Sequence, residues 1–457
     1  MDTEVADLVI VGAGPAGLAA ACEARQWGLS VTLLDEQLTP GGQIYRDVDA
    51  ASPRRRSLLG DDYGAGAELT AAFARSGARH VAGASVWNVG LDLQVNYLHQ
   101  RASRVAQGRH ILLASGAMER PFPIPGWTLP GVMTVGAAQI LLKSAGALPA
   151  APVVLAGCGP LLYVLADQYL RAGVRIEAVV HTTRPSDYLR AIPQLGSALR
   201  GWRELRKGMR LLDRLRRSGV PVYAGARSFS IEGSGRAEAI RFVHQQRSHR
   251  IASSLILLRQ GVVPNTQLSW ALDARHRWNP AQLCWEPETD DDGQFDHNGI
   301  YVAGDSRAIV GAEASASQGR LVALAVATKL LRGSPERERR ESAVRRELRR
   351  QLRIRPFVDA LYRPLQEHRI PPQVPVVVCR CEEVTAGQIR KFVELGCQGP
   401  NQAKAFGRCG MGPCQGRLCG LTVTELIAEA RGVSPGEVGY FHIRPPIKPV
   451  TLGDLAG

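Results

Sequence analysis

The chain has 457 residues, of which 45% are hydrophobic and 21% charged, a balance that excludes a disordered protein and suggests about three domains. No stretch reaches the ~20 apolar residues of a membrane span, and the acidic start, Met1-Asp2-Thr3-Glu4, is unlike a secretory signal, so we expect a cytoplasmic protein. The net charge is 56 − 42 = +14, yet no basic stripe is interleaved with aromatic residues, which argues against nucleic-acid binding. Anionic cofactors and acidic protein surfaces are simpler partners for this charge.

The N-terminal sequence predicts a strand, a glycine-rich turn, a helix and a second strand. Residues 8–11 are β-rich, the helical pattern continues to about Gln26, and the second strand ends at Asp35. In this context a GxGxxG turn indicates a dinucleotide site, because its glycines allow a tight turn, close approach of a pyrophosphate and close helix packing. The predicted ligand-binding residues are Gly12, Gly14, Pro15, Ala16 and Gly17, with Asp35 for the ribose hydroxyls and Glu36 as the weaker candidate.

Three further segments resemble the flavin-facing segments of flavoproteins with two dinucleotide-binding domains. They follow one another in the expected order, and in such proteins the aspartate of the last segment holds the ribityl chain. The resemblance therefore implies FAD at the first glycine loop. The absence of a CxxC or CxxxxC pair near either glycine loop argues against a dithiol reductase. The residues concerned are Gly42, Gln43 and Arg46 in GGQIYR, Ser115 and Gly116 in SGA, and Gly304 and Asp305 in YVAGD.

A second strand–glycine–helix unit begins 145 positions after the first. Gly157 and Gly159 match the fingerprint, but Leu162 replaces its third glycine, and His181 stands where a ribose-binding acid would be expected. Arg184 could accept a 2′-phosphate. We therefore leave three alternatives open for this unit: NAD(P), another adenine nucleotide such as ATP, or a fold that has lost its ligand.

The middle of the chain supplies further helices and strands. We predict helices in residues 184–217 and 314–331, strands in 236–258 and a strand in 300–303. Residues 332–355 contain ten arginines and four glutamates, with one apolar stripe at Val344, Leu348 and Leu352. We interpret this stretch as a solvated linker helix in preference to a partner-docking helix.

Six of the nine cysteines lie between positions 379 and 419, which in a cytoplasmic chain indicates ligation of metal or an iron–sulfur cluster rather than disulfides. A CxC pair, 27 intervening residues and a CxxxxC pair provide four thiolates, and the glycines of the second loop free N–H groups that can bond to sulfur. The predicted ligands of a [2Fe-2S] cluster are Cys379, Cys381, Cys409 and Cys414; structural zinc is the alternative. Cys397 and Cys419 are spare candidates.

Together these motifs resemble one family: the FAD- and [2Fe-2S]-binding alpha subunits of heteromeric bacterial dehydrogenases for D-hydroxyproline, opines and proline, to which one hydrogen cyanide synthase subunit is related. In that family a beta subunit with its own FAD oxidises the amine, and a small ferredoxin-like subunit can complete the complex. The cysteine module is similar to [2Fe-2S] domains of the bacterioferritin-associated ferredoxin type. The motifs are GAGPAGLAAA, PGGQIYR, ASGAMERPFPIPGWTLPGVMTVGAAQ, GVVPNTQL, YVAGD and CRCEEVTAGQIR…RCGMGPCQGRLC.

This resemblance implies an α/β fold with two Rossmann-like dinucleotide-binding domains and a small helical [2Fe-2S] domain. We expect five regions: a discontinuous FAD-binding domain (1–148 and 259–331), a second nucleotide-binding-like domain (149–258), a charged helical linker (332–374), the [2Fe-2S] domain (375–432) and a Pro-rich tail without helix (433–457).

The implied function is that of an electron-transferring subunit of an amino- or imino-acid dehydrogenase, with D-hydroxyproline as the first candidate substrate and opines and proline next. We expect no catalytic residue for amine oxidation in this chain, because the substrate site is expected on the beta subunit. The alternatives are a self-contained NAD(P)H-dependent reductase and a zinc-stabilised structural subunit.

Overall fold

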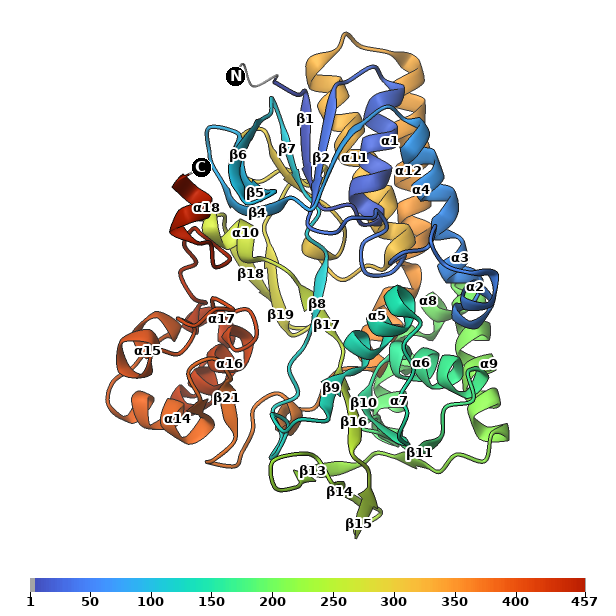
Figure 1. Ribbon diagram of the computed structural model, residues 1–457, viewed down its shortest axis with the longest axis vertical. Helices are drawn as coiled ribbons and strands as arrows, with labels where there is room; N and C mark the ends of the chain where they lie inside the picture. The colour runs from blue at the N-terminus through green and yellow to red at the C-terminus, as the bar shows by residue number, and fades with distance from the viewer. Residues whose placement is uncertain (1–4, 457) are drawn as a thin grey trace. The chain divides into compact units, whose positions relative to one another are not determined.

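The computed structural model describes residues 5–456, and the chain divides into two compact units, each made of separate stretches of sequence (Figure 1). Unit 1 contains Met1–Met118, Val263–Leu352 and His442–Gly457, and unit 2 contains Glu119–Val262 and Arg353–Phe441. The chain passes from one unit to the other within β8 (Ala117–Glu119) and β17 (Val262–Pro264). Within residues 5–456 no helix is both long and apolar enough to cross a membrane.

Unit 1 is built on a parallel five-stranded sheet in the order β20-β7-β1-β2-β3. The central strands are apolar on both faces, as parallel strands covered on two sides require. Their bounds are β1 Leu8–Val11, β2 Val31–Asp35, β3 Arg79–Ala82, β7 Ile111–Leu113 and β20 Ile300–Val302.

Helices α1 (Pro15–Gln26), α4 (Gly66–Arg75) and α11 (Ala312–Leu330) pack against this sheet in one hydrophobic core. The helices α1 and α11 approach very closely, because a Cβ on Gly319 would lie 2.0 Å from the carbonyl oxygen of Ala16. Figure 1 shows the antiparallel strands β4 (Ser85–Val89), β5 (Gln94–His99) and β6 (Ala102–Gln107) on the other side of the sheet from α1 and α11.

The remaining elements of unit 1 are short. They are α2 Pro53–Leu59, α3 Asp61–Gly64, α10 Gln267–Ala271, the paired strands β18 His276–Asn279 and β19 Cys284–Pro287, the 3₁₀ turn η2 Gly304–Ser306 and α18 Leu452–Ala456.

The charged helix α12 (Pro335–Gln351) contacts unit 1 along one side, although only Arg337 and Val344 of its residues are buried. Val344 is buried against Leu321 and Leu324 of α11, and Leu348 packs beside it. Arg340 forms an ion pair with the buried carboxylate of Glu23 at 2.7 Å. The apolar stripe is narrow, yet together with this ion pair it is enough to hold the helix on α11 and α1.

Unit 2 contains a second parallel five-stranded sheet, in the order β12-β11-β10-β16-β9, and an antiparallel sheet, β13-β14-β15. Every residue of β10 is buried, as expected for the central strand. The bounds are β9 Val132–Thr134, β10 Val153–Cys158, β11 Ile176–His181, β12 Val222–Ala224, β13 Arg227–Glu232, β14 Ala239–His244, β15 Arg247–Ala252 and β16 Leu255–Gln260.

The helical part of unit 2 matches the sequence-based expectation for residues 184–217, which form α7, α8 and α9. The helices that accompany the parallel sheet are α5 Val135–Ala145, α6 Pro160–Arg171, α7 Pro185–Ala191, η1 Ile192–Gln194, α8 Leu195–Arg200 and α9 Trp202–Arg217.

The C-terminal part of unit 2 is a small, mostly helical module. Its helix α14 begins at a capping box in which Thr385 and Gln388 bond reciprocally to backbone N–H groups. The segment that leads into the module forms η3 Leu352–Ile354, α13 Arg355–Leu361, which contacts α7 and α8, and η4 Gln366–His368. The elements of the module are β21 Val377–Cys379, β22 Val384–Thr385, α14 Ala386–Glu394, α15 Pro400–Gly407, α16 Gly420–Arg431 and α17 Pro435–Val438.

The tail differs from its prediction, because residues 433–457 contain the short helices α17 and α18. Its last part belongs to unit 1, where the N–H of Ile447 donates to the carbonyl of Trp87 and Lys448 pairs with Glu36 at 2.6 Å. These contacts give order to a segment whose proline content predicts no helix. The fold class itself is confirmed: two Rossmann-like parallel sheets and a C-terminal helical module.

The contact between α1 and α11 leads to a stability prediction. Gly319→Ala should lower the free energy of unfolding by about 1–3 kcal/mol, because the added methyl group must push backbone apart. Gly64→Ala is the matched control, since nothing lies within 4 Å of its Cβ position in the same unit. Urea unfolding of the full chain measures both, and equal midpoints would show that the helices can separate without cost.

Candidate functional site

The first glycine loop joins β1 to the N-terminus of α1 in unit 1. Gly12 adopts φ +111°, and a Cβ there would lie 2.4 Å from the carbonyl oxygen of Ala114, so only glycine fits. Gly14 is the N-cap of α1 and offers no side-chain hydrogen bond to the first turn. The N–H groups of that turn are therefore available to an anionic group, with the helix dipole adding positive potential.

Gly17 brings α1 close to the strand, since its Cβ would lie 1.9 Å from the carbonyl oxygen of Gly12. By contrast, a Cβ on Gly14 would meet only the Cα of Gly42, at 4.0 Å. The fold therefore requires glycine at Gly12 and Gly17. At Gly14 a methyl group fits the protein, so the fold itself does not require glycine there.

The three segments that resemble flavin-facing motifs converge on this loop. The Cβ position of Gly42 lies 2.7 Å from the Cα of Gly14, and that of Gly304 lies 3.0 Å from the Cβ of Ala16. Ser115 follows Ala114, the residue against which Gly12 packs. Segments separated by up to about 290 residues of sequence thus meet at the N-terminus of α1 (304 − 14 = 290).

Asp35 ends β2 beside the loop and holds it in place. Its carboxylate accepts hydrogen bonds from the N–H of Ala13 and, at 2.7 Å, from that of Gln37. Glu36, the weaker ribose candidate, instead pairs with Lys448. The acidic side chain that contacts the glycine loop is therefore Asp35.

Asp305 lies in the turn before α11 and accepts hydrogen bonds from the N–H groups of Val310 and Gly311, at 2.8 and 3.0 Å. The Ser115–Gly116 segment is tied to Asn265. The Ser115 hydroxyl donates to the Asn265 carbonyl at 2.9 Å, and the Asn265 N–H donates to the carbonyl of Gly116 at 3.0 Å. These bonds fix the backbone around the loop.

Two predicted residues lie in the GGQIYR turn. Gln43 is exposed, whereas Arg46 is half-buried and its carbonyl accepts a 2.7 Å hydrogen bond from the Tyr63 hydroxyl. Among residues 5–456, the Nε atom of Arg46 is a buried nitrogen without a hydrogen-bond partner. This arginine can therefore donate to an anionic ligand.

The second glycine loop makes the same close approach to a neighbouring strand, but its N-cap glycine, Gly159, adopts φ +99° where Gly14 has φ −79°. Gly157 adopts φ +134° and lies so close to β16 that its Cβ would be 1.7 Å from the carbonyl oxygen of Arg259; Gly159 is the N-cap of α6. Leu162, in place of the third glycine, is fully buried. The third glycine of the fingerprint serves close packing of helix on strand, and here a buried leucine side chain fills that position.

The chemistry around this second loop differs from that of the first. Arg259 is buried and pairs with Glu119 at 2.8 Å. His181, at the end of β11, is buried, and burial lowers its pKa to about 4, so it is neutral near pH 7. Arg184 is the N-cap residue of α7 and lies near Asp187. The ribose-binding acid at the end of the second strand is thus replaced by a neutral histidine, and the cationic residues favour phosphate groups.

Cys158, within this loop, is buried; its thiol donates to Gln260 at 3.4 Å, and burial raises its pKa to about 11. A protonated, enclosed thiol fits the interpretation of Cys158 as a packing residue.

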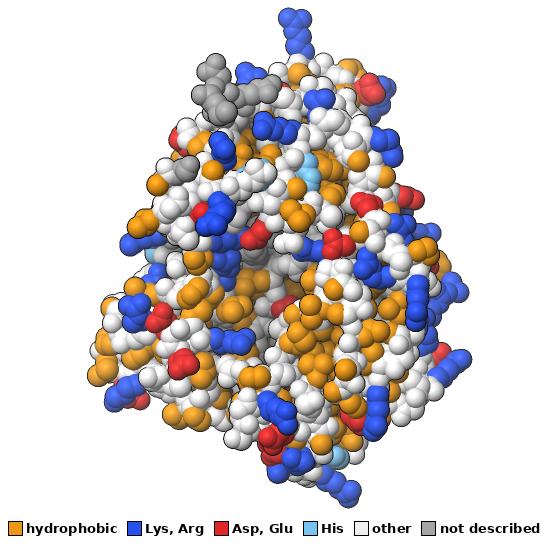
Figure 2. Space-filling model, in the orientation of Figure 1, with side chains coloured by type: hydrophobic (Ala, Val, Ile, Leu, Met, Phe, Trp, Pro, Cys, Tyr) orange, Lys and Arg blue, Asp and Glu red, His pale blue; other side chains and the backbone are white. Residues whose placement is uncertain are grey.

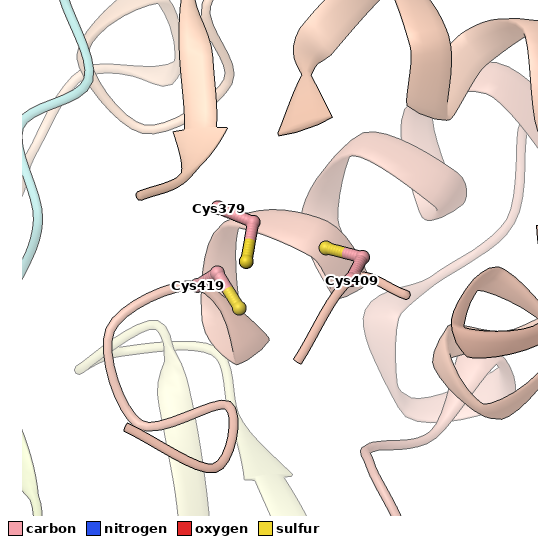
Figure 3. A group of neighbouring side chains, drawn as sticks. All are labelled: Cys379, Cys409 and Cys419. Carbon is pink, nitrogen blue, oxygen red and sulfur yellow. The ribbon is translucent and has the colours of Figure 1, made fainter. Parts of the chain in front are cut away.

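The cysteine module of unit 2 contains a group of thiols with metal-site spacing. The sulfur atoms of Cys379, Cys409 and Cys419 all lie within 4.8 Å of one another, and all three residues are buried. Figure 3 shows their side chains directed toward a common space from three separate segments. Three buried thiols that converge in this way are typical of a metal centre, and the donor set fits either zinc or an iron–sulfur cluster.

Two more cysteines adjoin this group. Cys414 is half-buried and Cys381 exposed, and hydrogen bonding with Cys419 lowers the pKa of the Cys414 thiol to about 5. Hydrogen bonds from Cys409 and Cys419 lower the pKa of Cys379 to about 2. The same hydrogen bonds raise the pKa of Cys409 and of Cys419, so within the group two sulfur atoms are stabilised as thiolates by thiols that keep their protons.

The glycines around these cysteines allow close packing of the chain, and some of them donate backbone hydrogen bonds to sulfur. A Cβ on Gly412 would lie 2.3 Å from that of Cys381, and one on Gly410 would lie 2.6 Å from the Phe441 ring. The N–H of Gly410 also bonds to the sulfur of Cys379, and that of Gly416 to Cys414. Such bonds are typical of a site that stabilises anionic sulfur.

Two of the four predicted ligands, Cys379 and Cys409, belong to this group, and its third member is Cys419, which sequence reasoning kept only as a spare. Cys414 adjoins the group through Cys419, and Cys381 adjoins Cys414. The available signal was the repeated spacing, because four residues separate Cys414 from Cys419 just as four separate Cys409 from Cys414. Cys397, the other spare, lies apart and donates to the carbonyl of Gly399 at 3.3 Å.

Comparisons with known proteins agree with this geometry. Residues 6–328 match the family model described as pyridine nucleotide-disulphide oxidoreductase, and residues 376–457 match the sarcosine oxidase A3 domain. The first match covers both glycine loops, and the second covers all of the clustered cysteines.

Several curated relatives align over almost the whole chain. The A subunit of opine oxidase from Agrobacterium tumefaciens (strain Ach5) is 46% identical, with 98% of this chain and 91% of the relative covered. The HcnB subunit of hydrogen cyanide synthase from Pseudomonas aeruginosa is 32% identical, with 97% and 96% covered. The alpha subunit of sarcosine oxidase from Rhizobium meliloti (strain 1021) is 28% identical; 99% of this chain is covered, but only 42% of the relative.

The fold also matches a solved structure, that of L-proline dehydrogenase from P. horikoshii, with a TM-score of 0.74. That match covers 99% of this chain and 80% of the other at 20% identity, so it supports the fold alone. The sequence matches carry the assignment: the chain is an oxidoreductase subunit that belongs to the pyridine nucleotide-disulphide oxidoreductase family and, within it, to the group that includes the A subunit of opine oxidase.

Proposed function

We propose that the chain is the electron-transferring alpha subunit of a heteromeric flavin-dependent dehydrogenase for amino or imino acids. The observation that carries the proposal is the presence, in one chain, of a glycine loop enclosed by flavin-type segments and a buried group of cysteines. The relatives named for opine oxidase support a secondary amino acid as the substrate class. Opines, D-hydroxyproline and proline share this chemistry: a C–H bond beside a secondary amine and a carboxylate.

The residues around the first glycine loop suit FAD. The N-terminus of α1 and the Gly14 turn would receive the pyrophosphate, Asp35 the adenosine ribose, and Asp305 the ribityl chain. Arg46 offers a buried nitrogen to an anionic part of the cofactor. The segments at Gly42 and Gly116 present backbone rather than side chains, which suits a flat ring system.

The cysteine group suits a [2Fe-2S] cluster, with Cys379, Cys381, Cys409 and Cys414 as the proposed ligands and Cys419 as their close neighbour. When bound, FAD accepts one or two electrons and a [2Fe-2S] cluster one, which allows a two-electron oxidation to be divided into single steps. Because Cys381 is the exposed member of the group, the module would meet its electron partner at the Cys381 edge.

Residues 5–456 present no convincing site for amine oxidation. Such a site needs a cationic clamp for the substrate carboxylate and a group that keeps the amine deprotonated. Arg46 and Arg120 lie in or near the flavin-type segments, but Arg120 is buried in unit 2 and Arg46 would serve the cofactor. We therefore place the substrate on an FAD-containing beta subunit, and a small ferredoxin-like subunit is a further candidate component.

The second glycine loop retains its fold with altered chemistry. We propose that it holds an adenine nucleotide, NAD(P) or ATP, through Gly157, Gly159 and the phosphate-binding cations nearby. The neutral His181, where an acid would bind ribose, argues against a self-contained NAD(P)H-dependent reductase.

Gly14→Ala tests the flavin site. The variant should lose FAD at this site because the methyl group occupies the pyrophosphate approach, while the protein still folds, since the nearest protein atom is 4.0 Å away. Flavin content after release by heat, measured beside the unfolding midpoint of the chain, gives both results. Gly17→Ala provides the contrast, because it should destabilise the fold itself. Full flavin content in Gly14→Ala would show that the loop is misassigned.

Serine substitutions test the ligand set. Cys379→Ser, Cys381→Ser, Cys409→Ser and Cys414→Ser should each lower iron and labile sulfide, whereas Cys397→Ser should leave both unchanged because its thiol bonds elsewhere. Iron analysis and the visible spectrum beyond the flavin bands are the measurements. If Cys419→Ser loses the cluster and Cys414→Ser keeps it, the fourth ligand is Cys419. Stoichiometric zinc with negligible iron would instead support the structural alternative.

The division of labour can be tested with the chain alone. Loaded with FAD and iron and mixed anaerobically with D-hydroxyproline, proline or an opine, it should show no flavin bleaching at a useful rate, because the substrate clamp lies on another polypeptide. The native complex, assayed with the same amino acids and an artificial dye, is the positive control. Rapid bleaching of the isolated chain would move the active site into this polypeptide.

A further inference from the structure

Half of the net charge of the chain lies in one short stretch of unit 2. Residues 184–217, which form α7, α8 and α9, contain ten basic and three acidic residues, a net charge of +7 (10 − 3) against +14 for all 457 residues. Two of the three acids are already engaged within the stretch: Asp187 pairs with Arg184 and Arg190, and Asp213 pairs with Arg217. The stretch therefore presents a strongly positive surface.

Several of these arginines have no partner. Within residues 5–456, no hydrogen bond or ion pair is formed by the side chains of Arg200, Arg203, Arg206, Arg210 and Arg216. By comparison, Arg214 pairs with the buried Asp167 at 2.8 Å and thereby holds α9 to α6. The unpaired arginines are thus left for something outside this chain.

The same stretch exposes large apolar side chains at helical spacing. Their exposed fractions run from 44% at Leu195 to 68% at Leu199, values unusual for so many large apolar residues in one stretch. Figure 2 shows an apolar area bordered by Lys and Arg side chains over the region of α5 to α9. We name this surface the 189–209 face; it consists of Leu189, Ile192, Leu195, Leu199, Trp202 and Met209.

Helix α9 has two apolar sides, of which only one is used within the chain. Leu211 and Leu215 are buried on unit 2. Trp202 and Met209 lie two turns apart on a different side, and Leu205 lies half-buried between them. A spacing of three and four residues gives a narrow seam, which is typical of contact with one helix of another protein.

These observations select among the possible occupants. A second copy of the chain would bring two surfaces of the same strong charge together, which is unfavourable. A lipid surface would require a wide apolar face, but the other side of α9 is fixed on unit 2 and the exposed seam is narrow. An acidic protein surface satisfies both the unpaired arginines and the apolar seam.

We infer that the 189–209 face binds the partner subunit of the complex through an amphipathic helix with acidic residues beside its apolar side. Trp202 and Leu199 form the apolar anchor, and Arg203, Arg206 and Arg210 pair with the acidic residues. The inference rests on the proposed function for the existence of that partner, and it adds the surface by which the partner is held.

The test uses the full tagged chain co-expressed with the other subunits of its native complex. The double variant Leu199→Asp/Trp202→Asp should weaken association by about 30-fold or more, as loss of an interface anchor does. The triple variant Arg203→Glu/Arg206→Glu/Arg210→Glu should weaken association strongly at low salt and less at high salt. The reason is that salt screens the electrostatic interaction between these side chains and the acidic partner. Dissociation constants from titration of separated subunits are the measurement.

Matched controls keep the result specific. Leu91→Asp replaces an apolar residue that is 61% exposed outside the face, and Arg227→Glu/Arg236→Glu/Arg247→Glu reverses three exposed charges elsewhere in unit 2. Both controls should bind like the wild type. Flavin content, iron content and the unfolding midpoint of every variant establish that the chain is folded.

Three results would overturn the inference. These are unchanged association of both face variants, weakening of the controls to the same degree, and binding of the wild-type chain to anionic phosphatidylglycerol vesicles that the double variant abolishes while the complex persists. A complex that separates as expected but oxidises no amino acid would leave the docking surface in place and refute the proposed function. A complex that stays intact in both variants and oxidises amino acids would do the reverse.

Discussion

The dinucleotide site of unit 1 depends on backbone segments that approach more closely than side chains allow. Gly12 lies against Ala114, and Gly42 against Gly14, at distances where a Cβ atom would overlap the neighbouring chain. Four segments can therefore meet at the N-terminus of α1, whose first N–H groups have no side-chain cap. This close packing also sets the positions of two aspartates. Asp35 bonds to the glycine loop, and Asp305 lies in the turn before α11.

Unit 2 shows that the close approach of a glycine to a neighbouring strand does not by itself determine which ligand is bound. Gly157 approaches β16 as closely as Gly12 approaches its own neighbour, yet the surroundings contain Arg259, Glu119 and the neutral His181. The close approach is required for the strand–turn–helix unit to form at all. The side chains at the carboxyl ends of the strands then decide which cofactor fits, and these have diverged between the two units.

The cysteine module and the basic helices α7 to α9 expose surfaces at which other molecules can bind. Cys379, Cys409 and Cys419 are enclosed, whereas Cys381 reaches the surface, so the cysteine group has one accessible edge. The helices α7 to α9 place charge and apolar residues on the surface of the same unit. An exposed edge at the cysteine group and a separate basic, apolar surface are consistent with a protein that works within an assembly.

Local pattern in the sequence determined the main elements. The periodicity of residues 8–35 and 153–180, together with the glycines between strand and helix, predicts both Rossmann-like units, because those glycines are required by short-range backbone geometry. The cysteine spacing predicted the module and two members of its buried group, Cys379 and Cys409. In these cases the residues that interact are close in sequence, or the motif is specific enough to imply the rest.

Only the tertiary structure decided the features that depend on distant contacts. The sequence of α12 predicts a solvated helix, but its Val344 is buried against Leu324 of α11. Cys419 and Cys379 are 40 residues apart in sequence (419 − 379 = 40), and the fold brings their sulfur atoms within 4.8 Å of each other. The spacing of the cysteines along the chain does not show this proximity. Packing between remote segments is set by the whole core, so the partners of an individual side chain are not encoded in its local pattern.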